Sequence, residues 1–220
     1  MSFFKTLFGS EKDAAPARRL EHPKNLQIGD IAKFGFAAQA AISNQSFVIE
    51  DVHSYDLGGE QKRKTVFTTE NSDGVLLRLA VIEERHQERL EIAIPLLPDD
   101  VQQIFDIDAF VDLLNPDTGT HHVLERIADV AELEGWTAPV YRQEQGHNAY
   151  FYDRDYRGLS LPEDADEGTA FSYYLLVSDD REYALEVQVF DGGQTEVYLL
   201  AYLAVEKIEE LWPAKAEVKV

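Results

Sequence analysis

Apolar and polar residues alternate along two long stretches of the chain, one in each half. In the segment 90–94, Leu and Ile residues alternate with Glu and Ala, and the segment 185–189 repeats this pattern with Leu and Val. Such alternation predicts strands of an antiparallel sheet with one buried face. The expected strands are 28–36, 47–55, 64–69, 75–82, 89–94, 137–144, 148–154, 171–178, 183–190 and 195–203.

Helical spacing predicts a central helix, 120–135, between the two β-rich stretches. A threonine can cap its start and a glycine can end it. Its buried stripe would consist of Leu124, Ile127, Ala128 and Ala131. Two short helices are expected near Asp99 or Asp100 and at Asp108, and a last helix is expected at 205–212, ahead of Pro213.

These elements indicate an α+β fold in which two mainly antiparallel β-sheet lobes are joined by the central helix. We divide the chain into a tail, 1–24, an N-terminal lobe with short helices, 25–119, and a second lobe, 120–220, with the central and last helices. Both halves run from strands through a hairpin to a short acidic helix. An internal duplication could explain this likeness, and chance repetition in a β-rich chain is the other explanation.

The composition excludes several functions. The 220 residues contain no cysteine, so disulfides, thiolate nucleophiles and thiolate metal sites are absent. A formal net charge of −21 opposes binding to nucleic acid. Because no glycine-rich phosphate loop or serine-nucleophile elbow occurs, we expect no cofactor and favour a non-enzymatic role. No apolar run of 18 residues and no secretory leader is found, so the cytoplasm is the expected location.

The first 24 residues differ from the rest because they carry five basic and three acidic side chains, a net charge of 5 − 3 = +2. Phe3, Phe4, Leu7 and Phe8 share an apolar side next to Lys5. This side could contact a protein partner, the protein's own body or a second copy, or a lipid surface. A tail without fixed structure is the remaining alternative.

Asp153, Asp155 and Asp164 are weak candidates for a metal site. They occupy the first, third and twelfth positions of a segment whose sixth position is glycine, as in a calcium loop. The fifth position is Arg157, whose positive charge argues against calcium. An enzyme of this type would need the carboxylates within 153–167 to converge on one pocket.

Nine of the ten tyrosines follow residue 140. Tyrosine suits surfaces that are partly dry and partly wet, as protein interfaces are. We therefore expect a partner-binding face formed by Tyr150, Tyr152, Tyr173, Tyr198 and Tyr202. The alternative is that these rings fill a core.

The segments YFYDRDYRG, at 150–158, and FSYYLLVSDDREYALEVQVFDGG, at 171–193, resemble the YjfK-like family of bacterial proteins. The start MSFFKTLFG and the proline-broken linker after it fit the same resemblance. The family has no assigned activity, so no catalytic residue carries over. The resemblance implies a setting of envelope stress near the inner membrane surface, beside phage-shock-protein-A-like coiled coils.

The expected function is therefore that of an acidic bacterial accessory or scaffold protein that acts through protein–protein interaction. A phage-shock-protein-A-like coiled coil is the candidate partner. One alternative is a metal-dependent or ligand-binding enzyme subunit that uses the carboxylates near 153–167. The other is a peripheral membrane protein anchored by residues 3–8.

Overall fold

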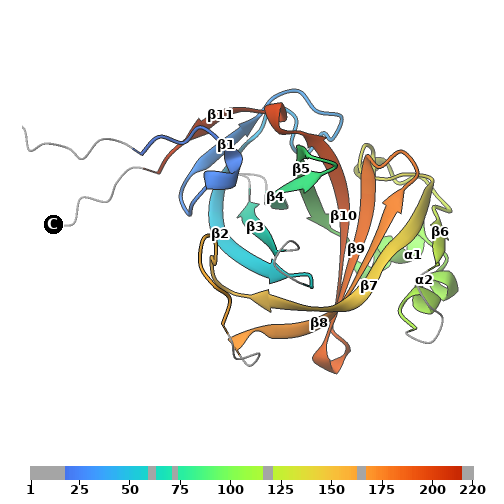
Figure 1. The fold of residues 1–220 in the computed structure, drawn as a ribbon. Coiled ribbons are helices and arrows are strands. Elements are labelled where there is room, and N and C mark those ends of the chain that lie inside the picture. The colour runs from blue at the N-terminus through green and yellow to red at the C-terminus, as the bar shows by residue number, and fades with distance from the viewer. Residues whose placement is uncertain (1–17, 59–62, 71–73, 116–120, 163–166, 215–220) are drawn as a thin grey trace, which may run out of the picture.

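A computed structural model describes residues 18–58, 63–70, 74–115, 121–162 and 167–214 (Figure 1). Its strands are β1 (Ile31–Phe34), β2 (Ser46–Asp56), β3 (Arg63–Glu70), β4 (Leu76–Glu84), β5 (Gln87–Pro95), β6 (Val123–Glu125), β7 (Val140–Tyr152), β8 (Thr169–Ser178), β9 (Tyr183–Phe190), β10 (Thr195–Ala204) and β11 (Ile208–Trp212). The helices are α1 (Pro98–Ile104) and α2 (Ile107–Leu113), with short 3-10 turns η1 (Pro23–Asn25), η4 (Ala131–Leu133), η6 (Asp191–Gly193) and η7 (Val205–Lys207).

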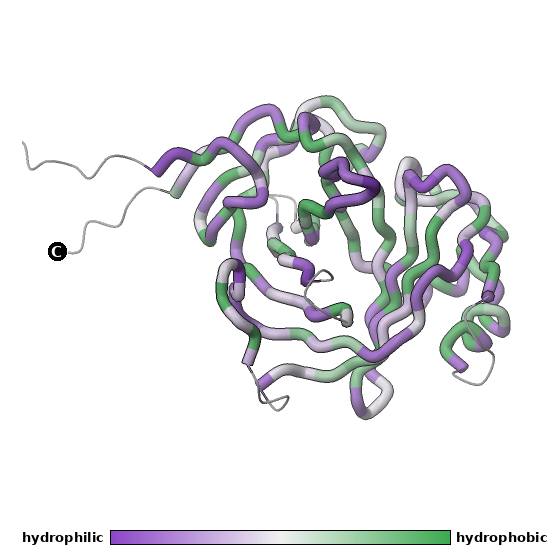
Figure 2. Tube along the Cα trace, viewed as in Figure 1, coloured by the Kyte–Doolittle hydropathy of each residue, from purple (hydrophilic) through white to green (hydrophobic). Residues whose placement is uncertain are grey.

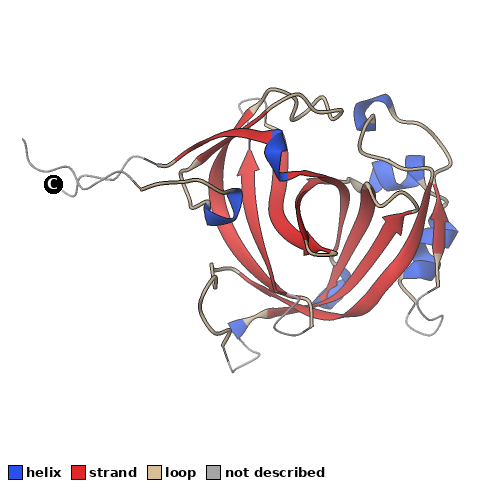
Figure 3. Cartoon of the chain, turned by 45° about the horizontal axis from the view of Figure 1, so that its top comes forward, coloured by secondary structure: helices blue, strands red, loops and turns tan. Residues whose placement is uncertain are grey.

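All the strands belong to one antiparallel sheet, in the order β11-β1-β2-β3-β4-β5-β10-β9-β8-β7-β6. A further pairing between β2 and β7 closes the sheet into a ring that runs from β2 through β5, β10 and β8 to β7. The pairing joins Ser54 to Tyr152, Tyr55 to Phe151 and Asp56 to Tyr150. Figure 3 shows this ring of strands with the two α-helices on its outside. We call the enclosed space the lumen.

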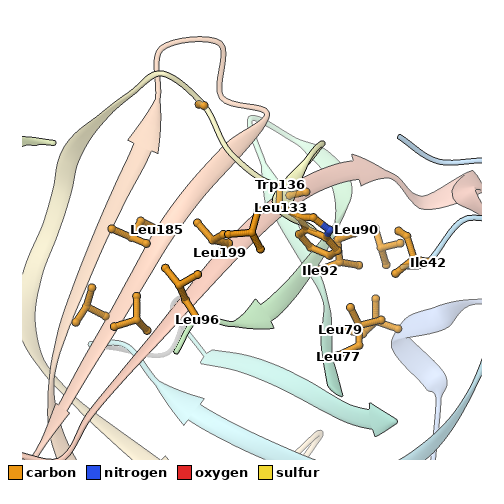
Figure 4. Close-up of a cluster of buried hydrophobic side chains, with 14 of the residues drawn as sticks. Ile42, Leu77, Leu79, Leu90, Ile92, Leu96, Leu133, Trp136, Leu185 and Leu199 are labelled. Carbon is orange, nitrogen blue, oxygen red and sulfur yellow. The ribbon is translucent and has the colours of Figure 1, made fainter. Parts of the chain in front are cut away.

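The outer face of the ring carries most of the apolar core, which we call the outer core. Alternate residues of β4, β5, β9 and β10 point outward and pack against loops that cover these strands from outside (Figure 4). Trp136 and Leu133 come from the loop before β7, and Ile42 comes from the loop before β2. Helices α1 and α2 add Val101, Ile104, Phe110 and Leu113 to the same cluster.

The predicted antiparallel, sheet-rich α+β character is confirmed, but the prediction of two lobes joined by a central helix is wrong. Strands from both halves of the chain pair within a single sheet, and β10 lies between β5 and β9. Alternation along a strand reports which residues share a face, and it does not report which strands become neighbours. Apolar and polar residues are interspersed along the ring in both halves (Figure 2).

The predicted central helix is also wrong over the residues that the structure describes. Leu124 lies in β6 and pairs with Tyr141 of β7, and only a 3-10 turn follows at Ala131–Leu133. The expected buried stripe does not form, because Leu124 is buried while Ile127 is 60% exposed. Ile127 instead donates its backbone N–H to the carbonyl of Ile104, 2.7 Å away. Strand pairing thus overrides helical spacing here.

The predicted last helix is a 3-10 turn followed by strand β11. Trp212 pairs with Ile31 of β1, so backbone hydrogen bonds to a distant strand replace those within a helix. The predicted strands 137–144 and 148–154 form one strand, β7, with an irregularity between Gln143 and Gln145. The two short helices form close to their predicted places, although Asp106 rather than Asp108 caps α2, accepting the N–H of Ala109 at 3.0 Å.

Candidate functional site

The lumen holds a network of charged side chains that span the ring, which we call the ion network. Lys64 of β3 reaches Glu91 of β5, at 2.5 Å, and Glu186 of β9, at 2.9 Å. β3 and β9 are not neighbours in the sheet, so the contact with Glu186 crosses the lumen. Tyr173 and Gln188 also donate hydrogen bonds to Glu186, at 3.3 and 2.6 Å. Glu186 therefore stands at the centre of the network.

Arg78 of β4 extends the ion network toward one end of the lumen. Its guanidinium lies 3.9 Å from Glu186 and 3.3 Å from Glu196. The same group lies 3.7 Å from the centre of the Tyr198 ring, a distance typical of a cation–π contact. Tyr198 in turn donates its hydroxyl to Glu196 at 2.8 Å. Arg78 is thereby held in place on two sides.

Burial and neighbouring charge shift the pKa values of the network in different directions. Burial raises the pKa of Glu91, because it outweighs the attraction of Lys64. Burial also opposes the charged form of Glu186, yet the charges of Lys64 and Arg78 outweigh it and lower the pKa of that carboxyl. Burial, reinforced by the charge of Glu186, raises the pKa of Tyr173 well above its ordinary value. Pairing with the cations thus favours the charged form of Glu186, and burial disfavours the charged form of Glu91.

Small side chains make room for this network in the lumen. Ala80, Ala93, Ala149 and Ala184 point inward from four different strands and are buried. In a small closed sheet, alternating small and large side chains fill the interior. Here the alanines leave space that the long side chains of Lys64 and Arg78 occupy.

Two pockets open at opposite ends of the lumen. One, of about 460 Å³, is lined by Lys64, Glu91 and Tyr173 among others. The second, of about 770 Å³, has Arg78 and Glu196 in its lining. We call the second the Arg78 pocket. The ion network separates the two, because Glu186 links Lys64 to Arg78.

Aromatic side chains make up much of the wall of the Arg78 pocket. Its lining includes Tyr55, Tyr150, Phe151 and Phe190. Tyr55 and Phe151 lie 5.2 Å apart between ring centres, which joins β2 to β7 at the closure of the ring. Asp191, Gln194 and Thr169 supply polar groups at the rim. The pocket combines flat apolar walls with a charged floor.

Two groups of the lumen have hydrogen-bonding capacity left over: Arg78, which lines this pocket, and Gln188, which is not among the lining residues. Within the described residues, Arg78 makes one hydrogen bond, to Glu196, although a guanidinium has five N–H donors. The side-chain oxygen of Gln188 is buried and has no partner among the described residues. Gln188 lies on the lumen side of β9, between Glu186 and Phe190, and is only 1% exposed. A buried acceptor without a donor lowers the stability of the fold.

The tyrosines predicted to form a partner-binding face lie mainly in the interior. Tyr173, Tyr198 and Tyr202 point into the lumen, and Tyr152 is buried beneath Gly168 and Tyr156. Tyr150 is partly exposed and lines the Arg78 pocket. The predicted tail contacts Phe3, Phe4, Leu7 and Phe8 lie outside the described residues. A protein-binding role for these side chains stays a prediction.

The candidate metal ligands do not converge in the part of the chain that the structure describes. Asp153 is largely exposed and lies 3.0 Å from His53. Asp155 binds Arg157, whose hydrogen bonds outweigh burial and lower the pKa of the carboxyl. Asp164 lies outside the described residues. Among the residues searched, no group of three or more His, Asp or Glu side chains is placed to hold a metal.

A larger surface hollow, of about 970 Å³, lies beside the turn between β4 and β5. Its charged side chains are engaged with one another: Glu84 contacts Arg181 at 2.6 Å and Arg89 at 3.3 Å. Arg181 also binds Glu144. Tyr202 is the one Phe, Tyr or Trp among the described residues that line this hollow, against four in the Arg78 pocket, which is therefore the better candidate site.

Sequence reasoning missed the residues at the centre of this site. Lys64, Arg78, Glu91 and Glu186 occupy polar positions of alternating strands, and such positions normally face water. The available signal was that three strands, β4, β5 and β9, carry a charge at mid-strand between apolar residues, whereas Lys64 lies near the start of β3 between polar residues. Only closure of the ring places these charges inside.

Comparison with known proteins found no match: no family model, no curated protein and no solved structure is similar to the chain. Among the described residues, no helix has the length and apolar character needed to cross a membrane.

Proposed function

We propose that the protein binds a small organic molecule with a flat ring in the Arg78 pocket. The observation that carries this proposal is the pocket itself, which joins a volume of about 770 Å³ to aromatic walls and a fixed Arg78. Ligand sites in proteins commonly enclose about 300–1,000 Å³ and place a few polar groups within apolar walls. The function proposed is binding, without a chemical step.

The ion network supports this proposal because burying its charges is unfavourable for stability, which suggests a role other than stability. Burying charges requires several kcal/mol of desolvation for each ion, and apolar side chains of similar size often serve stability as well or better. The ring nevertheless buries Lys64, Glu91 and Glu186 together. Groups held in this way are preorganised, so a ligand would not need to order them on binding.

The test is to fill the mouth of the pocket with a large side chain. Thr169 lies at the rim on an exposed position, so Thr169→Trp should block entry without disturbing the ion network. Saturation-transfer NMR with a library of ring-containing fragments would measure binding to the wild type and to the variant. Val111→Trp, at a 57% exposed position on α2, is the matched control.

We expect fragments to bind the wild type and Val111→Trp, and to lose at least about tenfold in affinity for Thr169→Trp, because the ring cannot enter. If no fragment binds the wild type, or if Thr169→Trp binds as the wild type does, the proposal is wrong.

A further inference from the structure

A line of side chains crosses five neighbouring strands, β11, β1, β2, β3 and β4, on one face of the sheet. Trp212 pairs with Ile31, Ile31 with Val48, Val48 with Glu70, and Glu70 with Leu76. Residues paired in this way across an antiparallel sheet point to the same face. We call these five residues the apolar row, because four of them are apolar. Val48 is 45% exposed, Leu76 is 48% exposed and Trp212 is 39% exposed.

The apolar row lies on the face opposite the outer core. Ala32, Phe47 and Leu77, each next to a row residue along its strand, are buried in the outer core. Neighbouring strands are about 4.8 Å apart, so the row is about 19 Å long. Contiguous exposed apolar surface of this kind marks a site of contact with another segment or molecule. No residue of the row lines the Arg78 pocket, so this contact would be separate from ligand binding there.

The tail joins the described structure beside the apolar row. Arg18, the first described residue, forms an ion pair with Asp30 and donates to the backbone carbonyl of Asn25 at 2.8 Å. Asp30 directly precedes Ile31 of the row. Residues 9–17 connect Arg18 to the apolar residues of the tail, and nine residues can span about 30 Å when extended. This reach exceeds the length of the row.

The chemistry of residues 3–8 complements the apolar row. The segment carries four large apolar side chains and one cation, Lys5. Glu70 interrupts the row with a negative charge that no ion pair among the described residues neutralises. Burying apolar side chains against the row would remove apolar area of both partners from water. The opposite charges of Lys5 and Glu70 favour the same contact.

We infer that residues 3–8 pack on the apolar row of the same chain. The apolar side chains of the tail would cover Trp212, Val48 and Leu76, and Lys5 would lie beside Glu70. The tail would then be an intramolecular cover for the sheet, and its docking does not depend on the proposed function.

Trp212 reports on this docking in the full chain. The chain has two tryptophans, and the other, Trp136, is 2% exposed. Acrylamide quenching of tryptophan fluorescence would be measured for the full chain and for the chain without residues 1–17. We expect the removal to raise the quenching constant of Trp212 about twofold, since the docked tail takes area of the ring out of water. In the Trp212→Phe background, the same removal should change nothing.

Point variants test the contact with the tail still present. Phe4→Asp should raise the quenching as removal of the tail does, because an unpaired charge is unfavourable against an apolar surface. Glu70→Lys should act in the same direction, because it repels Lys5. Val111→Asp, at a 57% exposed position on α2, is the matched control and should leave the quenching unchanged. Thermal melts would show that the variants are folded.

The other possible occupants of the row give different outcomes. Light scattering after size exclusion should find a monomer with and without residues 1–17. A dimer that requires residues 1–17 would place the tail on a second copy and overturn the inference. Unchanged quenching after removal of residues 1–17 would also overturn it, whether the row is covered by residues 215–220 or the tail binds vesicles of phosphatidylglycerol. None of these outcomes affects the test of the Arg78 pocket.

Discussion

The outer core and the lumen are built from alternate residues of the same strands, yet they bury different chemistry. On β9, Leu185 and Val187 face the outer core, whereas Glu186 and Gln188 face the lumen. On β5, Leu90 and Ile92 face outward, and Glu91 faces inward. These residues of both faces are buried, so burial alone does not decide which side chains a position accepts.

The difference lies in how each face gains stability. The outer core gains free energy from removing apolar area from water and from close packing under the covering loops. The lumen must instead pair the charges that it encloses, because an unpaired buried charge costs far more than a paired one. The outer core should therefore respond to changes in volume, and the lumen to changes in pairing.

The largest effect is expected from removing volume in the outer core. Trp136 is 2% exposed, and Trp136→Ala should lower the free energy of unfolding by about 4 kcal/mol, through lost burial and the cavity left behind. Trp212→Ala, at a 39% exposed position, is the control and should cost about 1 kcal/mol or less. Urea unfolding measures both. Equal losses for the two tryptophans would contradict the assignment of Trp136 to the outer core.

The second-largest loss of stability is expected from breaking an ion pair in the lumen. Lys64→Met nearly preserves side-chain length but leaves Glu186 and Glu91 without their shared cation, so we expect a loss of about 3 kcal/mol in urea unfolding at pH 7. Adding Glu91→Gln and Glu186→Gln to this variant should recover most of the loss, because no unpaired charge remains. A triple variant less stable than Lys64→Met would show that packing, rather than charge, governs the lumen.

The smallest effect is expected at the surface hollow, where water screens the charges. Burial opposes the charged form of Glu84, but Arg181 and Arg89 outweigh it and hold the pKa of Glu84 below its ordinary value of 4.5. The folded state therefore favours the ionised carboxyl, and its contribution is present above pH 4.5 and lost as the pH falls through the lowered pKa.

Glu84→Gln removes this contribution, which for such partly exposed ion pairs is about 1 kcal/mol or less. The variant should be less stable than the wild type at pH 7, and the gap should be smaller at pH 3. Urea unfolding at the two pH values measures the gap. A gap that is the same at both would show that the variant acts through packing instead.

Particular residues show how far the chain can be interpreted without its structure. Most strands were predicted close to their places, and so were the two short helices, because alternation and capping residues depend on neighbours along the chain. The segments 120–135 and 205–212 were predicted as helices, and their described residues form mostly strands, turns and irregular backbone, because their partners, β7 and β1, pair with them from elsewhere in the sheet. Local spacing does not encode those pairings.

The candidate site depends even more on distant contacts. The sequence alone determined that Glu91 and Glu186 share a face with other polar residues of their strands, because side chains alternate with a period of two. Whether that face meets water or another wall of the ring was decided by three residue pairs between β2 and β7. Closing the ring encloses one face of each strand from β2 to β7 in the sheet order at once, and it converts a solvent-facing set of charges into a buried network.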